Sequence, residues 1–145
     1  MNKLKCTILK TIPNKMGDIR KILNYRDDDF VGFCEAYISE IKYKSIKGWK
    51  LHKNKVCNLI VVHGLVKFVA WDPNQPDKYE TKLVGISESE PELFSRICIK
   101  ENIWFAFQGL GEPVSRVLNI SNINNEESIS ESLPLDYVNY SWSKF

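Results

Sequence analysis

The chain has 145 residues, a length that suits one domain with a sizeable buried core, and we take residues 1–145 as a single domain. Hydrophobic residues make up 43% of it and charged residues 26%, as in an ordinary soluble globular protein. The formal net charge is only +2, so the sequence lacks the strong basic excess of a nucleic-acid-binding protein, and we expect no nucleic-acid partner.

The N-terminus and the cysteines favour a reducing compartment. The first five residues, MNKLK, contain no apolar run like that of a signal peptide, and no stretch approaches the length of a membrane span. The four cysteines form no Cys-x-x-Cys pair, and they stand in apolar or strand-like settings where a thiol acts as a small hydrophobe. We therefore expect a cytoplasmic protein with no membrane partner.

Short strand-like stretches recur along the N-terminal half. Residues 5–13 alternate weakly and could form an edge strand. Residues 33–43 alternate strictly, so that Glu35 and Tyr37 share one face of the predicted strand. Two apolar strands follow, over residues 57–62 and 65–71, and the His-Gly pair between them predicts a tight hairpin.

The C-terminal half continues the same pattern, with no sustained helical period. A turn or one-turn helix is expected over residues 89–94, and residues 124–132 have the polar, acidic composition of a surface loop. The aromatic residues of 133–142 indicate that this segment packs back on the barrel or on a second subunit. Further short strands are expected over residues 82–86, 95–99, 104–108 and 114–120. Regularly spaced short strands predict an all-β sandwich or barrel.

One imidazole and one carboxylate are the best candidates for chemistry. His52, one of only two histidines, follows a basic glycine turn, and Asp72 ends the strand over residues 65–71. We expect the two side chains on neighbouring strands. A histidine can act as a general base near neutral pH with little tuning. One imidazole does not make a metal site, so we predict no metal and no cofactor.

The order of these motifs resembles the dTDP-4-dehydrorhamnose 3,5-epimerase family over most of the chain, from Gly17 to Trp142. Ile46-Lys47-Gly48 followed by His52 is similar to the family's Leu-Arg-Gly-Leu-His stretch. The segment from Gly64 to Asp72 is similar to its glycine-led strand that ends in Val-Ala-x-Asp. Residues 100–107 are similar to its Pro-Glu-Gly-Phe-Ala-His-Gly-Phe stretch. The resemblance implies an all-β cupin, a jelly-roll β-barrel with short helical turns.

The resemblance also implies a set of site residues. His52 takes the position of the base that removes a proton beside the 4-keto group of a nucleotide-linked deoxysugar. Asp72 takes the position of a carboxylate that orients the base or binds sugar hydroxyls, and Lys47 that of an arginine that contacts the nucleotide phosphates. Trp49 and Phe105 belong to an aromatic set for which core packing and stacking on a base or sugar are both open.

The sequence departs from the family at three positions. The family's enolate-stabilising lysine falls on Asn58, its second histidine on Phe105, and its proton-donating tyrosine near Ile123. Strand parity makes Tyr37 a candidate replacement proton donor and places Glu35 beside it, where the family has polar side chains that touch the sugar.

Two functional hypotheses follow from the resemblance. The first is an epimerase or isomerase of a dTDP-4-keto-6-deoxyhexose, acting in deoxysugar synthesis for a surface polysaccharide. The second is a catalytically reduced cupin that binds a nucleotide sugar or a glycan without full epimerase activity. The resemblance also implies a homodimer, because these barrels pair through an edge strand and an exchanged N-terminal segment.

Overall fold

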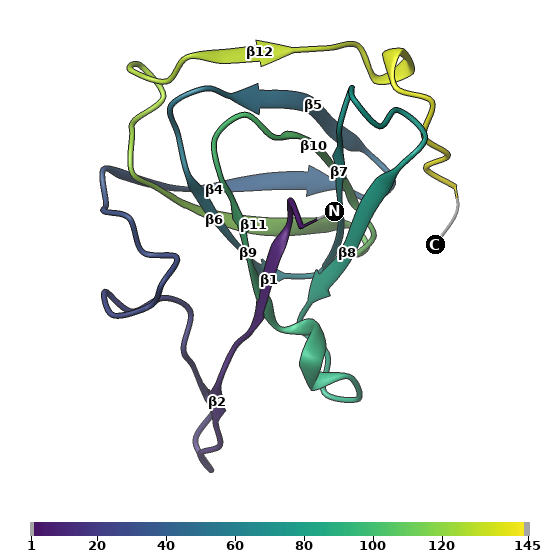
Figure 1. Cartoon of the computed structure of the whole chain (residues 1–145). Helices are drawn as coiled ribbons and strands as arrows, with labels where there is room; N and C mark the ends of the chain where they lie inside the picture. Colours follow the sequence, from purple (N-terminus) through teal and green to yellow (C-terminus); the bar gives the residue numbers. More distant parts are fainter. Residues whose placement is uncertain (1, 144–145) are drawn as a thin grey trace.

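Two antiparallel β-sheets face each other in the computed structural model, which describes residues 2–143 (Figure 1). In spatial order the first sheet contains β1 (Lys5–Ile8), β9 (Ser95–Ile99), β6 (Cys57–His63), β11 (Val114–Ser121) and β4 (Glu35–Lys42). The second contains β12 (Ser130–Ser132), β5 (Ile46–His52), β10 (Trp104–Gly109), β7 (Leu65–Trp71) and β8 (Tyr79–Gly85). The predicted all-β architecture is confirmed.

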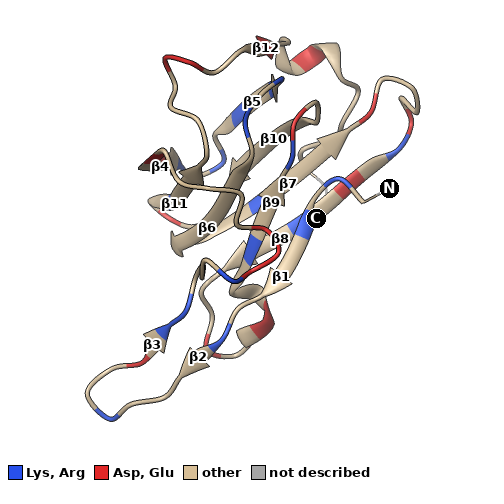
Figure 2. Ribbon diagram, turned by 60° about the vertical axis from the view of Figure 1, so that its left-hand side comes forward, with Lys and Arg blue, Asp and Glu red and all other residues tan. Residues whose placement is uncertain are grey.

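Four short elements lie outside the two sheets. The strands β2 (Thr11–Ile12) and β3 (Ile19–Arg20) form a two-stranded ribbon that projects from the barrel (Figure 2). The turns η1 (Pro91–Leu93) and η2 (Leu135–Tyr137) are single 3-10 turns, and η1 confirms the turn expected over residues 89–94. Within residues 2–143, no helix is long and apolar enough to cross a membrane.

The main hydrophobic core lies between the two sheets. Alternation along each strand sends every second side chain inward, which is why Phe68, Val66 and Ile97 are fully buried while their strand neighbours face the other way. Burial of one such side chain stabilises the fold by about 1.5–3 kcal/mol. The same alternation puts Tyr37 of β4 on the inner side of the first sheet, as its parity predicted.

The outer face of the second sheet is covered by the C-terminal segment. Trp49 and Trp71 form part of a buried cluster there, and the ring of Trp142 packs 5.9 Å from that of Trp49. The Tyr79 hydroxyl donates a hydrogen bond to the Asn139 carbonyl oxygen, at 2.6 Å. The aromatic tail therefore packs back on its own barrel, one of the two arrangements expected from its composition.

The predicted hairpin between β6 and β7 is wrong. These strands belong to different sheets, so the chain crosses from one sheet to the other at Gly64. Gly64 has φ +86°, and a Cβ atom there would collide with the side chain of Ser115. This close approach and the left-handed backbone both require a glycine. The glycine therefore marks a turn but does not indicate which sheet the next strand enters.

The segment expected to be a polar surface loop contributes a strand. Residues 130–132 form β12, which pairs with the edge of β5 in a register that sets Ser130 opposite His52. This pairing makes β12 the outermost strand of the second sheet, and it crosses the upper edge of the molecule in Figure 1.

A buried carboxylate fastens the loop before β4 to the outer side of the first sheet. Asp29, 4% exposed, accepts a hydrogen bond from Lys5 at 2.6 Å and pairs with Arg96 at 3.1 Å. Figure 2 shows the acidic stretch of this loop lying over basic positions of β1 and β9. The two cations hold the pKa of Asp29 below its usual value, against the opposing effect of burial.

Candidate active site

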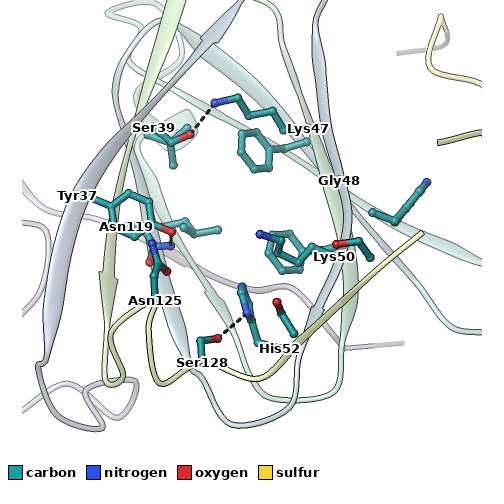
Figure 3. Close-up of a pocket in the computed structure, with 16 residues that line it drawn as sticks. Tyr37, Ser39, Lys47, Gly48, Lys50, His52, Asn119, Asn125 and Ser128 are labelled. Carbon is teal, nitrogen blue, oxygen red and sulfur yellow. Dashed lines mark hydrogen bonds between the residues drawn. The ribbon is translucent and has the colours of Figure 1, made fainter. Parts of the chain in front are cut away.

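A polar cavity of about 570 Å³ opens between the two sheets (Figure 3). Its volume lies within the range of small-molecule sites. Its walls come from β4, β6 and β11 of the first sheet, from β5, β10 and β12 of the second, and from the segment that leads into β12. The lining residues are Tyr37, Ser39, Lys47, Gly48, Trp49, Lys50, His52, Leu59, Phe105, Phe107, Val117, Asn119, Asn125, Ser128, Ser130 and Ser132.

A β-bulge in β5 decides which of its side chains enter the cavity. The pairing with β10 passes from Gly48 opposite Ala106 to Lys50 opposite Phe105, so Trp49 is an extra residue on its strand. The bulge lets the lysines on both sides of Trp49 face the cavity, as Figure 3 shows. The Trp49 indole turns the other way into the outer cluster, where it is 1% exposed. Of the two roles left open for Trp49, core packing agrees with this position of the indole, and its assignment to the substrate-binding set is corrected.

His52 lies at the end of β5 with its imidazole against the cavity wall. The residue is 8% exposed, and its ring centroid lies 6.0 Å from that of Phe105. Burial lowers the pKa of His52 to about 4, and the charges of Lys55 and Lys50 act in the same direction. The imidazole is therefore uncharged at neutral pH, the state in which it can accept a proton.

A phenol stands on the opposite wall of the cavity. Asn119 donates a hydrogen bond from its side-chain amide to the Tyr37 hydroxyl oxygen, at 2.9 Å, and the Asn125 side chain also acts on the phenol. Burial, with the nearby Cys57 and Glu35, raises the pKa of Tyr37, so the phenol stays protonated. Tyr37 is therefore equipped to donate a hydrogen bond or a proton.

A buried lysine lies beneath this wall. Lys55 is fully buried, and its Nζ donates to the Asn125 side-chain oxygen at 2.8 Å. The same Nζ lies 5.5 Å from the centroid of the Tyr37 ring. The acidic Glu35 lies at the edge of the group, where it accepts the backbone N–H of Asn125 at 3.3 Å. The positive charge of Lys55 adds to that of the lysines on β5.

The structure brings together part of the set of site residues predicted from sequence. His52, Tyr37, Lys47 and Phe105 all line the cavity, and Lys47 donates a hydrogen bond to the Ser39 hydroxyl at 3.0 Å. These positions are facts of the fold, and the roles of the four side chains are proposals taken up below.

Two predicted residues lie elsewhere, which corrects their placement. Asp72 is absent from the cavity wall, because β10 separates β7 from β5 and the carboxylate pairs with Lys3 at 3.2 Å. Asn58 points away from the cavity because its neighbour Leu59 takes the inward position on β6. The Asn58 amide instead donates to the Asp29 carbonyl oxygen at 2.9 Å. Neither residue can act on a ligand in this cavity.

Several cavity residues were missed from the sequence. Lys50 stands two positions before His52, and strand parity alone would have placed both on one face. The serines at 128, 130 and 132 repeat with period two, which is the pattern of a strand with one polar face. Asn119 and Asn125 carried no signal in the sequence.

The described residues contain no cluster that would hold a metal. Across residues 2–143, no group of three histidine, cysteine, aspartate or glutamate side chains is placed to bind one. The chemistry available in the cavity is that of one neutral imidazole, one phenol, cationic amines and neutral hydroxyl and amide groups.

No protein-family model and no curated protein sequence matches the chain. Solved structures do match it. A dTDP sugar isomerase from Desulfovibrio desulfuricans is 22% identical with a TM-score of 0.83, over 97% of this chain and 90% of that one. A 3,4-ketoisomerase from Thermoanaerobacterium thermosaccharolyticum, in complex with TDP-4-keto-6-deoxyglucose, is 17% identical with a TM-score of 0.70, over 89% and 88%.

A 3,5-epimerase is also similar. The enzyme from Legionella pneumophila, in complex with dTDP-4-keto-L-rhamnose, is 15% identical with a TM-score of 0.73, over 93% of this chain and 74% of that one. These identities establish the architecture and nothing finer. The chain has the cupin-like, all-β fold of the dTDP-sugar isomerases and epimerases.

Proposed function

We propose that this protein is an epimerase or isomerase of a nucleotide-linked 4-keto sugar and that His52 is its base. The observation that carries the proposal is an uncharged, nearly buried imidazole in the wall of a polar cavity that also holds a phenol and amines. Removal of a proton beside a carbonyl needs this type of base, and it needs a cation or donor near the oxygen that becomes negative.

The amines meet the second requirement. Lys50 reaches from β5 into the cavity beside His52, and Lys55 lies buried behind Asn125. When His52 takes the proton from the carbon next to the ketone, the electron pair moves to the ketone oxygen and forms an enolate. The ammonium groups stabilise that charge more strongly than bulk water would, because they are already in place and partly desolvated.

We assign the return of a proton to Tyr37, which lies on the sheet opposite His52. Its hydroxyl accepts a hydrogen bond from Asn119, and the protonated phenol has a proton of its own to donate. A proton delivered from this side reaches the face of the sugar opposite the face from which His52 removes one. This arrangement supports inversion at the carbon.

We place the nucleotide diphosphate toward Lys47. This lysine lines the cavity and is exposed at its margin, where an ammonium group attracts phosphate oxygens as a point charge. Phe105 and Phe107 supply apolar surface for a ring. Support comes from the similar structures, two of which hold a TDP-linked or dTDP-linked keto sugar. The cavity volume of about 570 Å³ suits a ligand of that size.

A second candidate function is binding of a nucleotide sugar without full epimerase activity. The observation that favours it is the apolar Phe105 in the cavity wall, where the resemblance implies a second histidine. In that case the cavity would hold the ligand while His52 contributes polarity instead of proton transfer.

The deciding experiment follows deuterium uptake from heavy water into dTDP-4-keto-6-deoxyglucose by NMR. We expect incorporation at the carbon next to the ketone with the wild-type protein and none with His52→Gln. The control is His63→Gln, which removes the exposed histidine at the end of β6. Uptake that persists in His52→Gln contradicts the base assignment. Saturable binding with no uptake in the wild type favours the binding protein.

We further propose that the protein works as a cytoplasmic homodimer. Large apolar side chains are exposed around β4 and on the projecting ribbon, among them Phe33 (64%), Ile38 (57%) and Met16 (95%). β4 is also an edge strand of the first sheet, with a free side for pairing. Sedimentation equilibrium should give twice the mass of the 145-residue chain, and a monomer at micromolar concentration contradicts this.

A further inference from the structure

We propose that Ser128 is the positioning residue for His52, and that its hydroxyl oxygen accepts the Nδ1–H of the imidazole so that the Nε2 lone pair faces the ligand. Ser128 Oγ lies 3.2 Å from His52 Nδ1, and the two side chains point toward one another in Figure 3. The inference rests on the proposed function, in which His52 is the base. It assigns to a neutral hydroxyl the task that the Asp72 carboxylate was expected to perform.

The segment that holds Ser128 is tied to the end of β5 on both sides. The backbone N–H of Lys53 donates to the Ile129 carbonyl oxygen at 2.8 Å. The Asn54 side chain accepts the Ile129 N–H at 2.9 Å and donates to the Glu127 carbonyl oxygen at 3.1 Å. These bonds bracket Ser128 and keep its hydroxyl beside the imidazole.

The direction of this hydrogen bond decides what His52 can do. A neutral imidazole carries one proton, on either Nδ1 or Nε2. If Nδ1–H donates to Ser128, Nε2 keeps its lone pair and can take a proton from a ligand. If the Ser128 hydroxyl donates to Nδ1, Nε2 carries the hydrogen and His52 can only donate. Action as a base therefore requires that serine accept.

A hydroxyl partner makes His52 a weaker base than a carboxylate partner would. The charged groups that act on the imidazole are Lys50 on its own strand and Lys55 on the following loop, both cationic. From β10 it meets the uncharged ring of Phe105, and from the segment before β12 the uncharged Ser128. The imidazolium formed during turnover is thus poorly stabilised and returns its proton readily.

The test observes the two histidines of the free protein by ¹⁵N NMR, without substrate. In the wild type at pH 7 we expect His52 to be the tautomer with hydrogen on Nδ1. In Ser128→Ala we expect that preference to be lost, and in Ser128→Thr, which keeps the hydroxyl, we expect it to be restored. Ser130→Ala, on the same segment but without a bond to the imidazole, should keep the wild-type tautomer.

Kinetics and a charged variant supply the remaining readouts. Ser128→Ala should lower kcat by roughly tenfold to a hundredfold with little change in KM, because the base is misoriented while ligand contacts remain. Ser128→Asp should raise the pKa of His52 in a titration followed by NMR. An Nε2–H tautomer in the wild type, or an unchanged tautomer in Ser128→Ala, overturns the inference. The expected tautomer combined with no deuterium uptake contradicts the proposed function and supports the placement of Ser128.

Discussion

His52 should make the stability of the protein depend on pH between about 4 and 6.5. The pKa of the folded protein's imidazole is about 4, against 6.5 for an exposed histidine. Between these values the unfolded chain binds a proton that the folded chain does not, so stability falls as the pH falls through this window and is fully present above it. A difference of about 2.5 pKa units, at about 1.4 kcal/mol per unit, corresponds to roughly 3.5 kcal/mol in full, of which about 3 kcal/mol is lost by pH 4.

Urea unfolding at a series of pH values from 7 to 4 measures this effect. Carboxylates such as Asp29 also lose stabilising interactions in acid, so the informative quantity is the difference between wild type and His52→Gln. We expect this difference to change by about 3 kcal/mol across the window, with the wild type losing more stability in acid. His63→Gln is the matched control. Parallel pH curves for wild type and His52→Gln would refute the buried, neutral imidazole.

Three further changes test other parts of the structure. Asp29→Ala should lower the free energy of unfolding by about 3 kcal/mol in urea, because it removes the buried partner of Arg96 and leaves the guanidinium only the more exposed Asp27. Exposed Asp28→Ala should change stability by less than about 0.5 kcal/mol. Trp142→Ala should lower the free energy of unfolding by about 2 kcal/mol, because the half-buried Trp142 ring packs on Trp49. Thermal melting of the variant measures this change. Lys47→Ala should weaken dTDP binding about tenfold in calorimetry, and the loss should shrink at high salt.

The strands were predictable where the hydrophobic pattern alone decides them. The predicted bounds of β7 and β9 agree with the structure residue for residue, because turn residues border both strands. The pairing of those strands was less accessible. Gly64 gives the same turn signal whether the chain folds back in one sheet or crosses to the other, and the choice depends on contacts distant in sequence.

In the candidate site too, local patterns were predictable from the sequence and contacts between distant residues were not. Tyr37 was found by parity because β4 is regular, and His52 by its chemistry. The sequence could not decide between core packing and stacking for Trp49, because a bulge shifts the parity of β5 and a bulge depends on the partner strand β10. Asp72 was misplaced because the order of strands in the sheet puts β10 between it and the imidazole. Ser128 lies 76 positions from His52, and only the tertiary fold brings the two together.

In the proposed function, the base and the acid lie on facing sheets, so proton removal and proton return occur on opposite sides of the ligand. His52 comes from β5 of the second sheet and Tyr37 from β4 of the first, on opposite walls of the cavity (Figure 3). If inversion needs a proton from the Tyr37 side, Tyr37→Phe should still exchange the substrate hydrogen with heavy water through His52 while net inversion stops. NMR of the recovered sugar nucleotide measures both in one sample. Equal loss of exchange and inversion would show that Tyr37 acts in ligand binding or in forming the enolate. Inversion at the wild-type rate in Tyr37→Phe would show that Tyr37 does not return the proton. Exchange without inversion is the result expected if His52 is the base and Tyr37 the acid, because the two side chains come from facing sheets.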